Sequence, residues 1–231
     1  MNKKFRGFLQ IFLPRFLIVT LRKIIGSLVL NPKKRLLFKS MRKSHKKLLV
    51  EVSKKEKIKV VFLVIHESVW KVDSVFKRMQ SDPYFDPLIL ICPYFPFGEE
   101  RAISEMDAAY KFFSGKGYPV ISSYNKDSKN KGFLKLSSLE PDLIFFTNPH
   151  NLTHKYYYED AYLNYLTCYV PYHHEVVSYD GDIDQYDQVF HNAIWRIFAP
   201  HKYSLETYEN KSHRKGKNVH VAGYPMMELL F

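Results

Sequence analysis

The chain has 231 residues, of which 46% are hydrophobic and 16% aromatic, enough for one large folded domain with an appendage. The net charge of +12 is uneven, because residues 1–57 hold 17 Lys and Arg against 2 Asp and Glu, whereas the other 174 residues hold 18 and 21. Nucleic-acid-binding domains spread basic charge over their folded face, so we expect no nucleic-acid partner. Cys92 and Cys168 each lie in an apolar run, and we expect both to be reduced core residues.

Residues 5–30 are rich in Phe, Leu and Ile, but charged residues interrupt them. Arg6, Arg15, Arg22 and Lys23 fall within this segment, and Pro14 would break a helix. A membrane-spanning helix needs about 20 predominantly apolar residues. No small-residue cleavage site marks a signal peptide either. We therefore expect neither a transmembrane helix nor a secretion signal.

The same segment and its continuation have the pattern of a membrane-surface helix. Apolar residues recur at helical spacing at Phe16, Leu17, Leu21, Ile24, Ile25 and Leu28, and a polybasic run over residues 31–47 follows them. This combination is typical of a helix lying on an anionic bilayer. The residues expected to contact the membrane are Arg15, Arg22, Lys23, Lys33, Lys34, Arg35, Arg42 and Lys43. Two alternatives remain open: a helix that packs on its own domain, and a nucleic-acid-binding arm.

From residue 58 onward, apolar runs alternate with amphipathic segments. Strands are predicted at residues 58–65, 87–92 and 120–122. The first helix, which Asp82-Pro83 ends, has an apolar stripe made of Val69, Val72, Val75, Phe76 and Met79. The second helix, over residues 98–115, is expected to face the core with Ile103, Met106, Ala109, Tyr110 and Phe113.

The second half continues the alternation. A polar loop is predicted over residues 126–132 and a short helix over 133–139, and further helices over 156–164, 186–193 and 203–211. Strands are predicted at 141–147, from 166, at 195–199 and at 219–222. Such alternation predicts an α/β fold with a doubly wound, parallel, Rossmann-like sheet. The expected organisation is a basic arm over residues 1–57 and a single domain over 58–231.

The common nucleotide and metal motifs are absent from the sequence. The first strand is followed by His-Glu-Ser-Val-Trp and not by a glycine-rich loop, and no P-loop motif occurs. An EF-hand starting at Asp180 would need Gly at position 185 and Glu at 191, where the chain has Gln185 and His191. We therefore interpret residues 180–184 as an acidic loop, and we expect neither a metal nor a cofactor.

Two adjacent histidines follow the strand that begins at residue 166. Pro171 should end that strand, which places His173, His174 and Glu175 just beyond its carboxyl end. Ligands bind there in open α/β sheets, and histidine is the usual general base near neutral pH. A structural role for the pair remains an equal alternative. His150 follows the preceding strand in the same way, so it is expected to line the same crevice.

Several segments, in this order, resemble the N-terminal half of the CDP-glycerol glycerophosphotransferases, the teichoic-acid polymerase and primase group. They are the opening strand Val60-Val-Phe-Leu-Val64, the helix with Trp70, Pro141-Asp-Leu-Ile-Phe-Phe146, the strand running into Tyr172-His173, and Val221-Ala-Gly-Tyr-Pro225. The resemblance covers residues 57–231. It implies a GT-B arrangement, in which an N-terminal Rossmann-like domain faces a lipid-linked acceptor and a C-terminal domain holds the nucleotide donor.

The resemblance also implies roles for the histidines. The family has a Trp-His-Gly motif where this chain has Tyr172-His173-His174, and its histidine is thought to act as a base. Tyr here stands in place of Trp and His in place of Gly. We expect His173 or His174 to take the proton of an acceptor hydroxyl as it attacks a nucleotide-diphosphate donor. His150 and Glu175 are expected to contact the acceptor, without a metal.

The expected function is thus the acceptor half of a glycerophospho- or glycosyltransferase that makes teichoic acid, capsule or lipopolysaccharide. It would act peripherally at the cytoplasmic face of the bacterial cell membrane. The donor domain of the family lies beyond residue 231, so we expect the chain alone to bind donor poorly and not to catalyse transfer. The alternative is a catalytically silent, membrane-docked binding domain, either a remnant or a subunit of a split enzyme.

Overall fold

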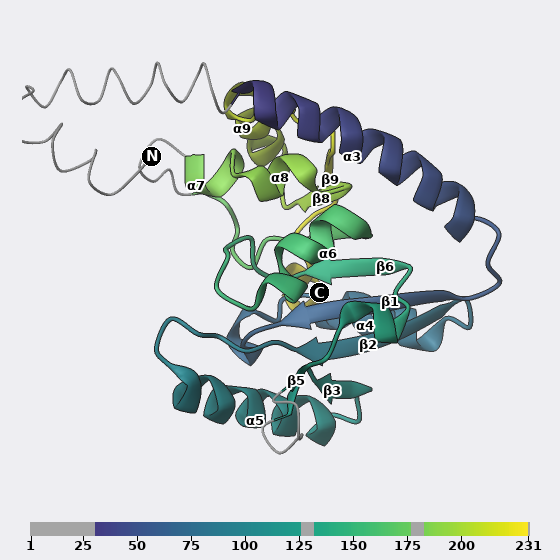
Figure 1. The fold of residues 1–231 in the computed structure, drawn as a ribbon, viewed down its shortest axis with the longest axis vertical. Coiled ribbons are helices and arrows are strands. Elements are labelled where there is room, and N and C mark those ends of the chain that lie inside the picture. The colour runs from purple at the N-terminus through teal and green to yellow at the C-terminus, as the bar shows by residue number, and fades with distance from the viewer. Residues whose placement is uncertain (1–30, 126–131, 177–182, 231) are drawn as a thin grey trace, which may run out of the picture.

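The computed structural model describes residues 31–125, 132–176 and 183–230. The amphipathic segment of residues 16–28, with Arg15, Arg22 and Lys23, lies outside the described residues, as do most of the 126–132 loop and the start of the acidic loop. Within the described ranges the protein is α/β, with one large parallel sheet and helices on both of its faces (Figure 1).

The large sheet has seven parallel strands in the order β3-β2-β1-β6-β7-β8-β9. The strands are β1 Ile58–Val64, β2 Phe85–Ile91, β3 Val120–Ser122, β6 Leu143–Phe146, β7 Leu166–Tyr169, β8 Arg196–Ala199 and β9 Val219–Val221. The order reverses between β1 and β6, as in a Rossmann-like fold. The predicted doubly wound parallel sheet is therefore confirmed.

Alternate residues of β1 feed two hydrophobic cores, one on each face of the sheet. Val61 and Leu63 belong to one core, whereas Val60, Phe62 and Val64 belong to the other. All five are at least 95% buried. A strand covered on both faces must be apolar at every position, which is why this stretch of sequence is so readily recognised.

Helices α4 and α5 cover the Phe62 face, and helices α3, α6, α8 and α9 cover the opposite face (Figure 1). Their bounds are α3 Asn31–Val52, α4 Asp73–Ser81, α5 Glu99–Gly115, α6 Glu159–Asn164, α8 Val189–Ala193 and α9 Lys202–Lys211. Shorter helical segments are η2 Glu67–Val69, η3 Leu136–Leu139, η4 Lys155–Tyr157, α7 Ile183–Tyr186 and η6 Pro225–Leu230. Cys92 and Cys168 are buried and free, as predicted.

Two local predictions were wrong. Tyr110 does not face inward: it is 41% exposed, and the buried stripe of α5 passes through Ala102, Met106, Ala109 and Phe113 instead. The helix predicted at residues 133–139 is only the 3-10 turn η3. Gly132–Phe133 forms strand β5, which pairs with β4 Tyr124–Asn125, and the Phe133 ring stacks on His154 with centroids 4.0 Å apart.

Helix α3 forms the described part of the predicted basic arm, and it packs on the domain. Phe38, Met41 and His45 are buried at spacings of three and four residues, which places them on one face of the helix. The exposed basic residues of α3 are Lys39, Arg42, Lys43, Lys46 and Lys47. The helix is therefore packed on one side and basic on the other. No helix among the described residues is both long enough and apolar enough to cross a membrane.

Phe62 offers a test of the core on the α4 and α5 face. Its ring stacks on Phe145 with centroids 4.7 Å apart and meets Trp70 and Phe76 edge-on. We expect Phe62→Ala to reduce the free energy of unfolding in urea by about 3–5 kcal/mol. Phe97→Ala is the control, because Phe97 is 59% exposed; it should lose about 1 kcal/mol or less, from its contact with Arg101. Equal losses in the two variants would contradict this packing.

Candidate functional site

Histidines follow three adjacent strands at the carboxyl edge of the sheet. His150 comes after β6, the pair His173 and His174 after β7, and His201 after β8. Parallel strands all end at one edge, so the fold brings these side chains together from distant parts of the sequence. His201 was not predicted. Its signal is visible in retrospect, since Pro-His follows β8 just as Pro-His follows β6.

The His174 ring lies between residues contributed by two other strand ends. Its centroid is 4.7 Å from that of His201 and 5.4 Å from that of Tyr224. His201 Nδ1 accepts the backbone N–H of Ser204 at the start of α9, so its Nε2–H donates to the His174 carbonyl at 2.7 Å. The Tyr224 hydroxyl donates to the Tyr172 carbonyl at 3.1 Å. The Gly-Tyr-Pro segment after β9 is thereby attached to the Tyr-His-His segment after β7.

His173 is held as a neutral hydrogen-bond donor. Its Nδ1 accepts the backbone N–H of Glu175 at 3.0 Å, so the neutral ring carries its proton on Nε2. Burial lowers the pKa of His173, and the nearby His150 lowers it further. At neutral pH this imidazole therefore offers an Nε2–H group, while its lone pair is occupied by the backbone.

His150 is oriented in a similar way. Its backbone N–H donates to the Asn148 side chain, and its Nδ1 lies 3.2 Å from the Gln188 side-chain nitrogen. The Gln188 oxygen accepts from the Tyr158 hydroxyl and caps the start of α8, which turns the amide nitrogen toward His150. An amide nitrogen can only donate, so Nδ1 of His150 accepts and the neutral ring again carries Nε2–H.

His174 differs from its two neighbours, because its ring is open to solvent. It is exposed, and no described residue forms a hydrogen bond with its ring nitrogens. An imidazole whose lone pair is not occupied can accept a proton from a ligand. Within the cluster, His174 is therefore the ring best placed to act as a base, with His173 and His150 as donors beside it.

Glu175 lies inside the domain and not on the crevice surface predicted for it. Its side chain is 2% exposed, and Oε1 accepts from the Tyr208 hydroxyl at 3.3 Å, whereas Oε2 has no hydrogen-bond partner among the described residues. Burial raises its pKa to about 7. The backbone is left-handed here, with φ of 52°, which turns the chain inward after His174. Glu175 is thus an interior residue beneath the Tyr172-His173-His174 segment, and its side chain is not exposed to contact an acceptor.

A mainly apolar hollow of about 530 Å³ lies beside the cluster on the α4 side of the sheet. Its walls include Val170 just after β7, Phe198 from β8, Met79 from α4, and Tyr224 and Met227 from the segment after β9. Tyr224 also contacts His174, so the hollow and the histidine cluster share a wall. No group of three metal-binding side chains is assembled within the described ranges.

No protein-family model matches the chain, and no curated protein matches it at a significant level of similarity. Its function is therefore inferred from the arrangement of its own side chains, together with the motif resemblance.

Glu175 should make stability depend on pH. A carboxyl whose pKa is raised from 4.5 to about 7 on folding stabilises the fold fully below pH 4.5, and this contribution is lost as pH rises to 7. Glu175→Gln keeps an acceptor for Tyr208 but cannot ionise. We expect the free energy of unfolding of the variant, relative to that of the unmodified protein, to rise by about 2 kcal/mol when the pH is raised from 5 to 7.5.

Urea unfolding of both proteins at the two pH values measures this gain. His45 titrates in the opposite sense, because burial and the nearby Arg214 and Arg196 lower its pKa to about 4. Its contribution is common to both proteins and cancels in the comparison. A constant difference between the two proteins across this range would show that Glu175 is ionised in the fold.

Proposed function

We propose that this chain is the acceptor-side domain of a GT-B-type transferase related to the CDP-glycerol glycerophosphotransferases, acting in bacterial cell-envelope polymer synthesis. One observation carries the proposal. Two motif segments, Tyr172-His173-His174 and Gly223-Tyr224-Pro225, meet at the carboxyl edge of the sheet through contacts of Tyr224, which lies 52 residues after Tyr172. The Rossmann-like strand order supports it, since such an edge is where this fold binds ligands.

In the proposed reaction, an acceptor hydroxyl attacks the glycerol-bearing phosphorus of the donor, and the bond between this phosphorus and the oxygen that bridges the two phosphates breaks. The hydroxyl proton passes to the open nitrogen of His174 as the new bond to oxygen forms, and the nucleotide departs with the electrons of the bond that breaks. The Nε2–H group of His173 holds an acceptor oxygen in place, and His150 lies beside it at the same edge. The apolar hollow beside Tyr224 accommodates a less polar part of the acceptor. By the resemblance, a second domain holds the nucleotide donor opposite this edge.

The proposed location is the cytoplasmic face of the cell membrane. The basic side of α3 supports peripheral attachment, because each Lys or Arg near an anionic bilayer contributes about 1 kcal/mol of attraction. This attraction weakens with added salt, which screens charges beyond roughly 8–10 Å.

Histidine substitutions test the proposal in the complete enzyme, with the donor-binding domain present. The measurement is transfer of labelled glycerol phosphate from CDP-glycerol to a lipid-linked acceptor. We expect His174→Ala to lower kcat by about 10²–10⁴-fold with little change in KM, as loss of a general base does. His173→Ala should mainly raise KM, because it removes a donor to the acceptor. His220→Ala is the control, since His220 is exposed on β9 and should leave both constants unchanged.

The outcomes separate the alternatives. A larger loss of kcat in His173→Ala than in His174→Ala would transfer the role of base to His173, which would require the Glu175 N–H to release Nδ1. Unchanged kinetics in both variants would remove the histidines from the chemistry. A complete enzyme that binds the acceptor but transfers nothing would favour the silent, membrane-docked binding domain.

A further inference from the structure

A cluster of basic side chains lies at the amino edge of the sheet, opposite the histidine cluster. The loop between α9 and β9 and the middle of α3 enclose a hollow of about 390 Å³. Its walls are Phe38, Arg42, His213, Arg214, Lys215 and Lys217. Four of these six residues are permanent cations, and no acidic side chain from the described residues lines the hollow.

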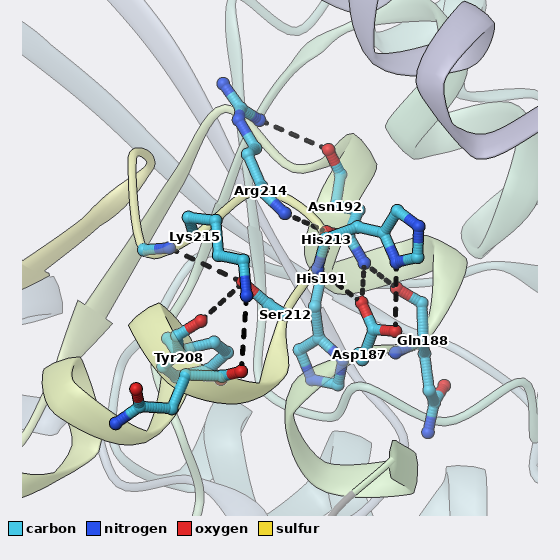
Figure 2. Close-up of polar contacts among 11 residues, drawn as sticks. Asp187, Gln188, His191, Asn192, Tyr208, Ser212, His213, Arg214 and Lys215 are labelled. Atoms are coloured by element: carbon cyan, nitrogen blue, oxygen red, sulfur yellow. Dashed lines mark hydrogen bonds and ion pairs between the residues drawn. The ribbon is translucent and has the colours of Figure 1, made fainter. Parts of the chain in front are cut away.

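The loop is held rigidly by buried polar groups (Figure 2). Asp187 accepts hydrogen bonds from the His213 backbone N–H at 2.8 Å and from the Asn192 side chain at 2.8 Å. Asn192, which is fully buried, accepts in turn from the Arg214 backbone N–H at 3.0 Å. The Arg214 guanidinium donates to the Ile194 carbonyl at 2.6 Å. These hydrogen bonds fix the backbone of the loop and the Arg214 guanidinium, whereas they do not hold the exposed side chains of Arg42 and Lys217.

The cations of this wall have no carboxylate partner among the described residues. None of Arg42, Arg214 and Lys217 forms an ion pair with a carboxylate of the described residues, and Asp187 is engaged by His213. Burial lowers the pKa of Arg214 to about 10, and repulsion from Arg42 and Arg196 adds to it. The neighbouring His45 has no hydrogen-bond partner in the described part of the chain for either ring nitrogen. Like charges held together without counter-charges destabilise the empty pocket, and a bound anion would relieve that repulsion.

We propose that this basic pocket binds a phosphate group, with Arg42 and Lys217 as its principal mobile contacts and Arg214 as its fixed cation. Arginine and lysine are the preferred partners of phosphate, and arginine can offer two parallel N–H donors. The phosphate could be that of a phospholipid headgroup or a soluble phosphate. The exposed basic face of α3 adjoins the pocket through Arg42. The proposal is independent of the histidine cluster, since the loop precedes β9 and the histidines follow the strands.

The test compares two double variants of the full chain that lose the same charge from exposed cations. Arg42→Gln with Lys217→Gln removes the mobile contacts of the pocket, whereas Lys39→Gln with Lys43→Gln removes two cations of α3 that do not line it. Arg214 is left intact because its hydrogen bonds hold the loop. Urea unfolding confirms that both variants fold. Binding is measured to phosphatidylglycerol vesicles, to neutral phosphatidylcholine vesicles, and to inorganic phosphate and pyrophosphate by calorimetry.

We expect the pocket variant to lose at least about tenfold more affinity than the control variant, because it loses charge-assisted hydrogen bonds to phosphate in addition to the general attraction that both variants lose on an anionic surface. Loss confined to phosphatidylglycerol vesicles identifies a lipid headgroup as the source of the phosphate, and loss also seen with the soluble anions identifies phosphate in general. Equal losses in the two variants would mean that overall charge is responsible, and would overturn the pocket. Failure of the unmodified chain to bind any of the anionic probes would overturn it as well.

Discussion

Parallel pairing of the seven strands is the constraint on which the other features depend. Parallel strands need crossovers that return the chain to the same starting edge of the sheet. All turns that leave a strand therefore lie at the carboxyl edge, and all turns that enter a strand lie at the amino edge. In this chain the turns at the carboxyl edge carry His150, His173, His174 and His201. The turns at the amino edge carry the Arg214 loop. One topological rule thus separates the histidine cluster from the cationic pocket.

The roles of the individual histidines are set by hydrogen bonds from backbone N–H groups two or three residues along the chain. A neutral imidazole has one donor and one acceptor nitrogen, and a backbone N–H that donates to Nδ1 leaves the proton on Nε2. This happens at His173 and at His201, whereas no described residue does so at His174. His173 and His201 are therefore hydrogen-bond donors through Nε2–H, whereas His174 keeps an open acceptor nitrogen. The chemical asymmetry arises from the turn after β7 and the start of α9.

The sequence predicted the fold most reliably at strands that are buried on both faces of the sheet. The β1 and β2 runs are apolar because both faces of the sheet are covered, so the strands and the parallel character of their sheet could be predicted, although their order could not. The interior position of Glu175 could not be predicted. It depends on a left-handed backbone at Glu175 and on Tyr208, a residue 33 positions later whose hydroxyl donates to the carboxyl. Likewise, Phe133 lies outside any helix, where it pairs with Tyr124 and stacks on His154, and neither contact could be predicted from the local sequence.

The separation of the two sheet edges sets a minimum distance between the histidine cluster and the Arg214 pocket. His201 follows the carboxyl end of β8, whereas Arg214 contacts the carbonyl of Ile194, just before the amino end of that strand. Four strand residues span about 13 Å at 3.3 Å each. A phosphate seated against Arg214 is thus at least a strand length from the imidazoles and cannot itself be the reacting group. If a single acceptor occupied both places, its hydroxyl would have to be carried more than 13 Å from its phosphate. An extended polymer satisfies that condition, and a bare headgroup does not.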